Sequence, residues 1–214
     1  MNKSTLMIFC VWIPALLAGC AGVATVVPGT DVYFQDDFSD PSGGWDRVND
    51  ADGVTDYAGG TYRLFAAVPD YYLWANPGRQ FARDVRIEVD AIKTAGPNDG
   101  VFGIICRYQN AENFYIFMIS GDGQAGIAKV ESGLGLVMLS GVSLQPNDRI
   151  QTGLATNHLQ ADCLGSTLSL LVNGAQAASA TDDSFSGGDA GLWLGDFDMP
   201  GVDVYFDNFI VRKP

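Results

Sequence analysis

Aromatic side chains stand beside polar residues in a pattern that could bind a sugar ring. Tyr72 and Trp74 alternate in one short run, and Trp193 lies shortly before Asp196. Aromatic faces stack on the apolar C–H faces of sugars, whereas carboxylates and guanidinium groups bind hydroxyls. Taken singly, each aromatic could instead be a core residue, as we expect for Trp45. The candidate ligand-binding residues are Trp74, Tyr72, Arg107, Tyr108, Tyr115, Trp193 and Asp196.

Two carboxylates, Glu88 and Asp90, could perform acid–base chemistry because alternate residues of a strand share one face. The same spacing is typical of a surface strand, on which Arg86, Glu88 and Asp90 would meet partners on neighbouring strands. We favour this structural role and predict no catalytic residue. His158, the only histidine, stands beside Asn157 in an expected hairpin turn. Neither a catalytic triad nor a zinc site can be assembled around it.

The four cysteines divide into two kinds. Cys10 lies in an N-terminal targeting segment, and Cys20 stands at its end. Cys106 and Cys163 remain as an even pair. In an exported protein such a pair most simply forms a disulfide, and two isolated cysteines are a poor metal or catalytic site.

Residues 1–19 have the pattern of a signal peptide, with Lys3 before an apolar run that is too short to span a bilayer. The run ends in Leu17-Ala18-Gly19-Cys20, which resembles the bacterial lipobox, so we expect cleavage before Cys20 and lipidation of its thiol. A plain secretory signal or an anchor helix is the alternative. Ala21 follows the cysteine in place of a retaining aspartate, which favours the outer membrane or cell surface. Residues 20–30 would form the lipidated tether.

Acidic residues dominate the charge of the chain. The formal net charge is -13, and loss of residues 1–19 with Lys3 would make it -14. Such a charge repels phosphate backbones, so nucleic-acid binding is excluded, and contact with a membrane is expected through the anchor only. About 180 residues follow the tether, which is enough for one well-packed domain over residues 31–214.

Short apolar or alternating runs recur between clusters of Gly, Asp, Asn and Pro, and no stretch has a sustained helical period. Two runs, 101–106 and 114–119, are apolar on both faces, as in central strands covered on both sides. One face should fill the core, and the other could line an aromatic groove with Arg107 and Tyr115 as polar groups. The pattern predicts a β-sandwich or barrel. The expected strands are 32–38, 61–67, 71–75, 85–94, 101–109, 114–120, 124–130, 136–139, 149–156, 158–163, 167–172, 190–194 and 202–211.

The order of several motifs along residues 31–213 resembles a known superfamily. These motifs are Phe34-Gln-Asp-Asp-Phe-Ser-Asp40, Gly44-Trp45, Gly60-Thr-Tyr-Arg-Leu64, Asp84-Val-Arg-Ile-Glu-Val-Asp90, Phe102-Gly-Ile-Ile-Cys-Arg-Tyr108, Asn113-Phe-Tyr115, Leu170-Leu-Val-Asn-Gly174 and Val204-Tyr-Phe-Asp-Asn-Phe-Ile-Val211. Together they resemble the concanavalin A-like jelly-roll superfamily, in particular extracellular bacterial domains related to LamG-like and 3-keto-disaccharide hydrolase-like domains. The resemblance implies an all-β, two-sheet antiparallel jelly-roll sandwich of the lectin/glucanase type, with a concave carbohydrate-binding face.

The resemblance also bears on metal binding and catalysis. Relatives often hold a structural calcium, and Asp37 and Asp207 occupy the matching positions, with the carbonyl near Gly60 as a third ligand. Laminarinase-type relatives carry Glu-x-Asp-x-x-Glu on one strand, whereas this chain has Lys93 in place of the second glutamate. A protonated lysine is a poor proton donor to a glycosidic oxygen.

We therefore predict a cell-surface lipoprotein with a non-catalytic, lectin-like domain that binds a glycan or polysaccharide. One structural calcium is a candidate, the alternative being that Asp37 and Asp207 are solvated acids or cap strand ends, and no organic cofactor is expected. Two alternatives remain. One is a glycoside hydrolase or 3-keto-glycoside hydrolase of the same fold. The other is a protein-interaction or adhesion module of the envelope.

Overall fold

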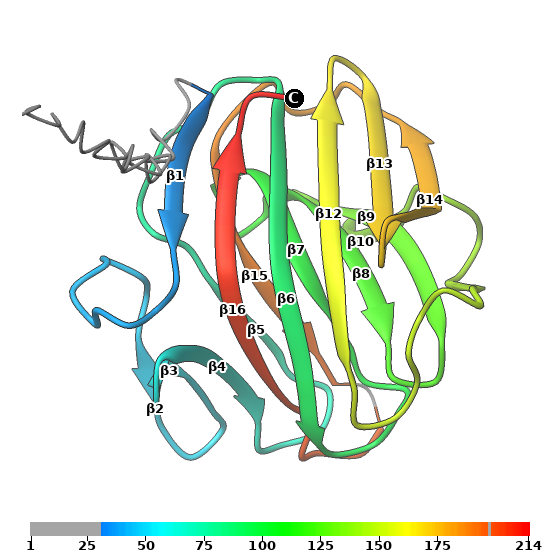
Figure 1. Cartoon of the computed structure of the whole chain (residues 1–214). Helices are drawn as coiled ribbons and strands as arrows, with labels where there is room; N and C mark the ends of the chain where they lie inside the picture. The colour runs from blue at the N-terminus through cyan, green and yellow to red at the C-terminus, as the bar shows by residue number, and fades with distance from the viewer. Residues whose placement is uncertain (1–30, 197) are drawn as a thin grey trace, which may run out of the picture.

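The computed structural model describes residues 31–196 and 198–214. The predicted signal segment, the tether and the lipidation site Cys20 lie outside the described residues. Within these described residues, sixteen strands form two antiparallel sheets, which confirms the predicted jelly-roll sandwich (Figure 1). Among the described residues, no helix has the length and hydrophobicity needed to cross a bilayer.

Sheet A forms the front layer in Figure 1. Its nine strands are β1 (Val32–Asp36), β2 (Val48–Asn49), β3 (Gly53–Ala58), β4 (Thr61–Ala66), β6 (Val85–Ala95), β12 (Thr156–Leu164), β13 (Thr167–Val172), β14 (Ala175–Thr181) and β16 (Asp203–Arg212). Their order is β14-β13-β12-β6-β16-β4-β3-β2, and β1 also pairs with β16.

Sheet B lies behind it and has seven strands. These are β5 (Tyr72–Ala75), β7 (Val101–Asn110), β8 (Asn113–Ser120), β9 (Gln124–Glu131), β10 (Gly135–Met138), β11 (Gln145–Pro146) and β15 (Asp189–Gly195). The order is β10-β9-β8-β7-β15-β5, and β11 pairs with β9.

The main core fills the space between the sheets, and alternation along each strand decides which residues enter it. On β6 every second residue from Val85 is buried, whereas Arg86, Glu88 and Asp90 lie on the outer face. Trp45 is buried in this core, as predicted. The burial of apolar side chains from both sheets is the principal force that holds the layers together.

A disulfide joins the two sheets through the core. Cys106 of β7 is bonded to Cys163 of β12, 57 residues later in the chain. The predicted pairing is therefore confirmed.

Strand β16 changes its neighbour on one side near its middle. Residues from Asp203 to Phe206 pair with β4, whereas residues from Phe209 to Arg212 pair with β1. The pairing with β6 has an irregularity between Asp207 and Ile210, and Asn208 has a φ of 56°. Asparagine tolerates this left-handed conformation better than most residues. The outer face of sheet A is therefore interrupted at this point.

Two sequence-based expectations about residues 149–158 are wrong. Residues 149–155 form no strand, and β12 begins at Thr156 and continues through Asn157 and His158. The buried amide of Asn157 accepts the N–H of Gln151 and donates to its carbonyl, so it stabilises the preceding loop from within a strand. His158 is consequently a strand residue opposite Asp90.

Candidate functional site

The outer face of sheet B carries a second apolar cluster, separate from the main core. It arises because β7 and β8 are apolar on both faces, so the residues not used by the core point outward. We call this surface the aromatic face. Its buried members are Val101, Ile105, Phe114, Ile116, Met118, Ala128 and Trp193, and Trp74, Tyr108, Val130, Met138 and Leu144 pack against them.

Aromatic pairs cross this face from strand to strand. Tyr72 of β5 stacks on Trp193 of β15 with ring centroids 5.7 Å apart. Trp74 and Tyr108 flank Phe114, with centroid distances of 6.1 Å and 5.4 Å. Tyr72 is 44% exposed, whereas Trp193 is only 2% exposed. Four predicted ligand-binding residues, Tyr72, Trp74, Tyr108 and Trp193, thus lie on one face, where the buried Trp193 supports the ring of Tyr72.

A hollow of about 330 Å³ lies beside Tyr72 and Trp74, at the edge of sheet B. Asp46, Arg47 and Thr55 contribute polar groups to its lining. Arg47 forms a 2.6 Å ion pair with Asp56. The hollow therefore combines aromatic rings with hydrogen-bonding groups, the combination that sugar recognition requires. The remaining lining residues are Val48, Tyr71 and Leu73.

Two buried polar residues at one end of the aromatic face were not predicted from the sequence. Asn76 follows β5 and is 4% exposed; its amide donates to the carbonyl of Ala190, and its side-chain oxygen has no partner among the described residues. Asp189 begins β15 opposite Tyr108 and accepts the N–H groups of Arg79 and Ala190. Burial raises the pKa of Asp189 to about 6, although these backbone bonds oppose the shift.

Arg107 and Tyr115, expected to be polar groups of the groove, lie away from the aromatic face. A bulge follows Cys106, and Arg107 itself has a φ of 54°, so the alternation of β7 breaks at this residue. Arg107 is 1% exposed and donates to the carbonyls of Arg83, Phe185 and Gly165. It therefore ties three loops together.

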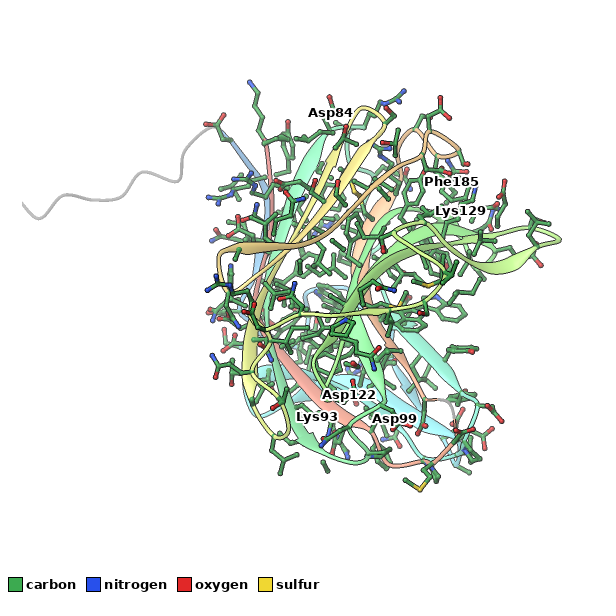
Figure 2. All side chains as sticks on the ribbon, turned by 90° about the vertical axis from the view of Figure 1, so that its right-hand side faces the viewer. Asp84, Lys93, Asp99, Asp122, Lys129 and Phe185 are labelled. Carbon is green, nitrogen blue, oxygen red and sulfur yellow. A yellow bond between two sulfur atoms is a disulfide. The ribbon has the colours of Figure 1, made fainter. Side chains whose placement is uncertain are left out.

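The hydroxyl of Tyr115 belongs to a polar cluster at the same end of the sandwich. It donates to Asp182 at 2.6 Å and accepts the N–H of Phe185 at 3.1 Å. Lys129 lies 3.2 Å from the carboxylate of Asp182. Figure 2 shows Lys129 and Phe185 close together at this end. We assign these residues a structural role.

Asp196, the remaining predicted ligand residue, is buried directly after β15. Its backbone N–H donates to the carbonyl of Tyr71, 3.0 Å away. The bond links the end of β15 to the segment that leads into β5. Asp196 therefore lies next to the run that contains Tyr72.

Glu88 and Asp90 lie on the outer face of sheet A, on the opposite side of the molecule from the aromatic face. Asp90 contacts Nδ1 of His158 at 2.8 Å, and Glu88 accepts a hydrogen bond from Arg212. Lys93 points to the interior instead, and its ammonium donates to the carbonyl of Gly96 at 2.7 Å. Figure 2 shows Lys93 at the other end of the sandwich from Lys129. The three residues aligned with the laminarinase-type motif therefore do not share a face.

The predicted calcium residues Asp37, Gly60 and Asp207 come from the segment after β1, the β3–β4 turn and β16, respectively. Asp37 accepts the hydroxyl and the N–H of Ser39, which together lower its pKa. Asp207 accepts the N–H of Asn208. Within the described parts of the chain, no group of three or more His, Cys, Asp and Glu side chains could hold a metal. A calcium ion at these positions stays a prediction.

No protein-family model matches the sequence, and no curated protein sequence is similar to it. Solved structures do resemble the fold. A carbohydrate binding module, CBM66 from Bacillus subtilis, has a TM-score of 0.64 at 19% identity, over 79% of this chain and 96% of that one. A Bacillus subtilis protein of unknown function with a galectin-like fold has a TM-score of 0.60 at 11% identity, over 85% and 96%.

A third similar structure is a xylan beta-1,4-xylosidase from Bacillus halodurans, with a TM-score of 0.59 at 15% identity. The match covers 84% of this chain but only 39% of the xylosidase. Identities this low are evidence for a shared fold, not for a shared function. The comparisons thus agree with the strand order in showing an antiparallel β-sandwich fold.

Proposed function

We propose that this protein is a non-catalytic glycan-binding module that uses the aromatic face and the hollow beside it. Tyr72 and Trp74 would stack on the sugar rings, and Asp46 and Arg47 would bind hydroxyl groups. Through Cys20 the module would be lipid-anchored to the cell envelope, facing the exterior.

The observation that carries this proposal is the exposed ring of Tyr72 beside the polar hollow. A tyrosine that is 44% exposed while its other side stacks on Trp193 is held as a rigid platform. Its orientation is fixed before a ligand arrives, so little conformational entropy is lost on binding. The same ring forms part of the lining of the hollow, next to Asp46 and Arg47.

Similar structures add support of a weaker kind. They include a carbohydrate binding module and a xylosidase, both of which handle glycans according to their names. The match covers 96% of the carbohydrate binding module but only 39% of the xylosidase. A binding role is thus the simpler analogy.

The non-catalytic part of the proposal rests on the surroundings of Glu88 and Asp90. Arg212 and His158 already bind these carboxylates, and the residue at the position of the second glutamate is the buried Lys93. A retaining glycosidase needs two carboxyl groups about 5 Å apart across the scissile bond, one of them protonated. Turnover of an oligosaccharide by the purified protein would overturn this part.

A glycan-array screen of the purified protein, with and without calcium, tests the binding proposal. We expect saturable binding to one class of neutral glycan. Tyr72→Ala and Trp74→Ala should each weaken it by about tenfold or more, the equivalent of about 1.4 kcal/mol. Tyr33→Ala is the matched control, since Tyr33 is an exposed tyrosine on β1 in the other sheet.

A shallow site of this kind binds single sugars weakly, so clustering of anchored copies would supply avidity. The array should therefore be printed at high glycan density. If no glycan binds either with or without calcium, the glycan proposal is overturned and a protein-interaction role for the same fold is favoured.

A further inference from the structure

A second hollow lies on the outer face of sheet A, away from the aromatic face. Its volume is about 540 Å³. It lies where β16 exchanges β4 for β1 as its neighbour and where the backbone of Asn208 bends. The lining combines amide, imidazole, carboxylate and apolar groups from four strands and the segment after β1: Gln35, Asp36, Asp37, Glu88, His158, Asn208, Phe209 and Ile210.

The lining of this hollow is rich in hydrogen-bond acceptors and negative charge. Asp36, Asp37 and Glu88 contribute carboxylates, and none of the described lining residues carries a permanent positive charge. Asp36 is already satisfied, because one oxygen accepts the N–H of Phe38 and the other the indole N–H of Trp45. Both bonds to Asp37 end on Oδ1, which leaves its Oδ2 without a donor among the described residues. The carboxylates of Glu88 and Asp37 therefore remain available to a ligand.

His158 has a fixed orientation in this hollow. Its Nδ1 lies 2.8 Å from Oδ1 of Asp90, and the amide of Asn208 donates to the other oxygen of the same carboxylate. An ionised carboxylate can only accept, so in the neutral form of the ring Nδ1 carries the proton and Nε2 presents its lone pair. That lone pair points into the neighbourhood of Glu88, whose Oε2 lies 3.6 Å from Nε2.

Nε2 of His158 and Oε2 of Glu88 are thus two acceptors with no proton between them. Their separation is too long for a hydrogen bond to each other. A single nitrogen that carries several N–H groups can lie at about 2.8 Å from both atoms at once. Arg212 does not fill this role, because its guanidinium binds the other oxygen of Glu88.

We propose that this hollow binds a primary ammonium group carried by a small polar molecule, such as an amino sugar. The ammonium donates to Nε2 of His158 and Oε2 of Glu88, and Asp37 supplies further negative charge. The amides of Gln35 and Asn208 face the polar body of the ligand, and Ile210 offers an apolar surface. This site does not depend on the proposed glycan site, with which it shares no lining residue.

Proton NMR offers a direct test because His158 is the only histidine in the sequence. Its ring C–H signals therefore report on this hollow without ambiguity. We would titrate the purified protein at pH 7.5 and low salt with glucosamine, and with glucose as the isosteric neutral control. We expect a saturable shift of the His158 signals with glucosamine and at least about tenfold weaker binding of glucose.

Variants separate a built site from general attraction to an acidic surface. Glu88→Gln and Asp37→Asn should each weaken glucosamine binding by about fivefold or more, and Asp37→Asn leaves the Glu88–Arg212 pair in place. Asp148→Asn removes the same charge from an exposed residue outside the hollow and should change nothing. Trp74→Ala, which should weaken binding at the proposed glycan site, should leave the shift intact.

Three results would overturn the proposal. Equal binding of glucose and glucosamine would show that the amino group is not recognised. An equal loss in Asp148→Asn would show attraction by net charge alone. Saturable binding of calcium that moves the His158 signals, without any effect of glucosamine, would assign the hollow to a metal ion.

Discussion

The ring of Tyr72 lies nearly parallel to that of Trp193, with an interplanar angle of 20° and a centroid distance of 5.7 Å. The two residues come from adjacent strands, since Tyr72 pairs with Gly195 and Trp193 with Trp74. The side chain of Trp193 folds along its own strand over Gly195, where an added Cβ would lie only 2.4 Å from the indole. A glycine at this position therefore lets the indole lie flat and support the tyrosine.

This support predicts different consequences for the two residues. Tyr72→Ala should weaken glycan binding and cost about 1 kcal/mol of stability or less, because the ring that is lost is 44% exposed. Trp193→Ala removes a buried ring and should lower the free energy of unfolding by about 3–5 kcal/mol. Urea denaturation of both variants, combined with binding assays, checks this. Equal losses of stability would contradict the assignment of Trp193 as the buried support.

Reduction of the disulfide is predicted to destabilise the domain. Cys106 and Cys163 link β7 to β12 across 57 residues, and closure of a loop of that length contributes about 4 kcal/mol in the chain-entropy model. Thermal unfolding with and without dithiothreitol should therefore show a lower Tm after reduction. The Cys106→Ala/Cys163→Ala variant should have a Tm close to that of the reduced protein, and dithiothreitol should not change it. A reductant effect in that variant would point to a different cause.

Strong apolar patterns allowed much of the fold to be predicted from sequence. The runs 101–106 and 114–119 became β7 and β8, buried on both faces as their composition indicated. Strands whose sequence has only a weak apolar pattern were not predicted. The strands β3 and β14 were missed, because Gly53–Ala58 and Ala175–Thr181 are built from small and polar residues without a clear apolar alternation. Their pairing with β4 and β13 supplies the stability that local sequence does not.

In the candidate site, too, residues that stand out in a short segment could be predicted, whereas residues that depend on contacts between distant segments could not. Tyr72 and Trp74 could be identified because exposed aromatics in a short strand stand out in the sequence. Asn76 and Asp189 could not, since their environment exists only when the segment after β5 folds onto β15. Arg107 was assigned to the groove by simple alternation, which the bulge after Cys106 breaks.

Asp182 is predicted to stabilise the fold above acidic pH. Partial burial would raise its pKa, but hydrogen bonds from Tyr115, Ser184 and Lys129 outweigh burial and lower the pKa to about 2. A lowered pKa means that this stabilisation is present above the ordinary value of 3.8 and is lost as the pH falls towards 2. Asp182→Asn should therefore cost about 1–2 kcal/mol at pH 7 and much less near pH 2. Urea titrations at both pH values test this, with Asp183→Asn, an exposed neighbour, as the control.

Asp189 is predicted to give stability the opposite pH dependence, with more stabilisation at low pH than at high pH. Burial raises its pKa from 3.8 to about 6, so the folded state favours the protonated carboxyl. The stability that this preference contributes is complete below about pH 4 and is lost as the pH rises through 6. A shift of this size corresponds to at most about 3 kcal/mol, which partial solvation should reduce to about 2 kcal/mol.

Asp189→Asn isolates this contribution, because asparagine keeps the shape and one acceptor oxygen but cannot ionise. In wild-type protein, the free energy of unfolding should fall between pH 4 and pH 6.5 relative to the variant, whereas the exposed Asp148→Asn control should follow the wild type. Because Asp189 lies opposite Tyr108 at the end of the aromatic face, the same pH interval should also alter glycan affinity if that face is the binding site. If the free energies of unfolding of the wild type and of Asp189→Asn differ by the same amount throughout this pH range, the prediction of a raised pKa for Asp189 is wrong.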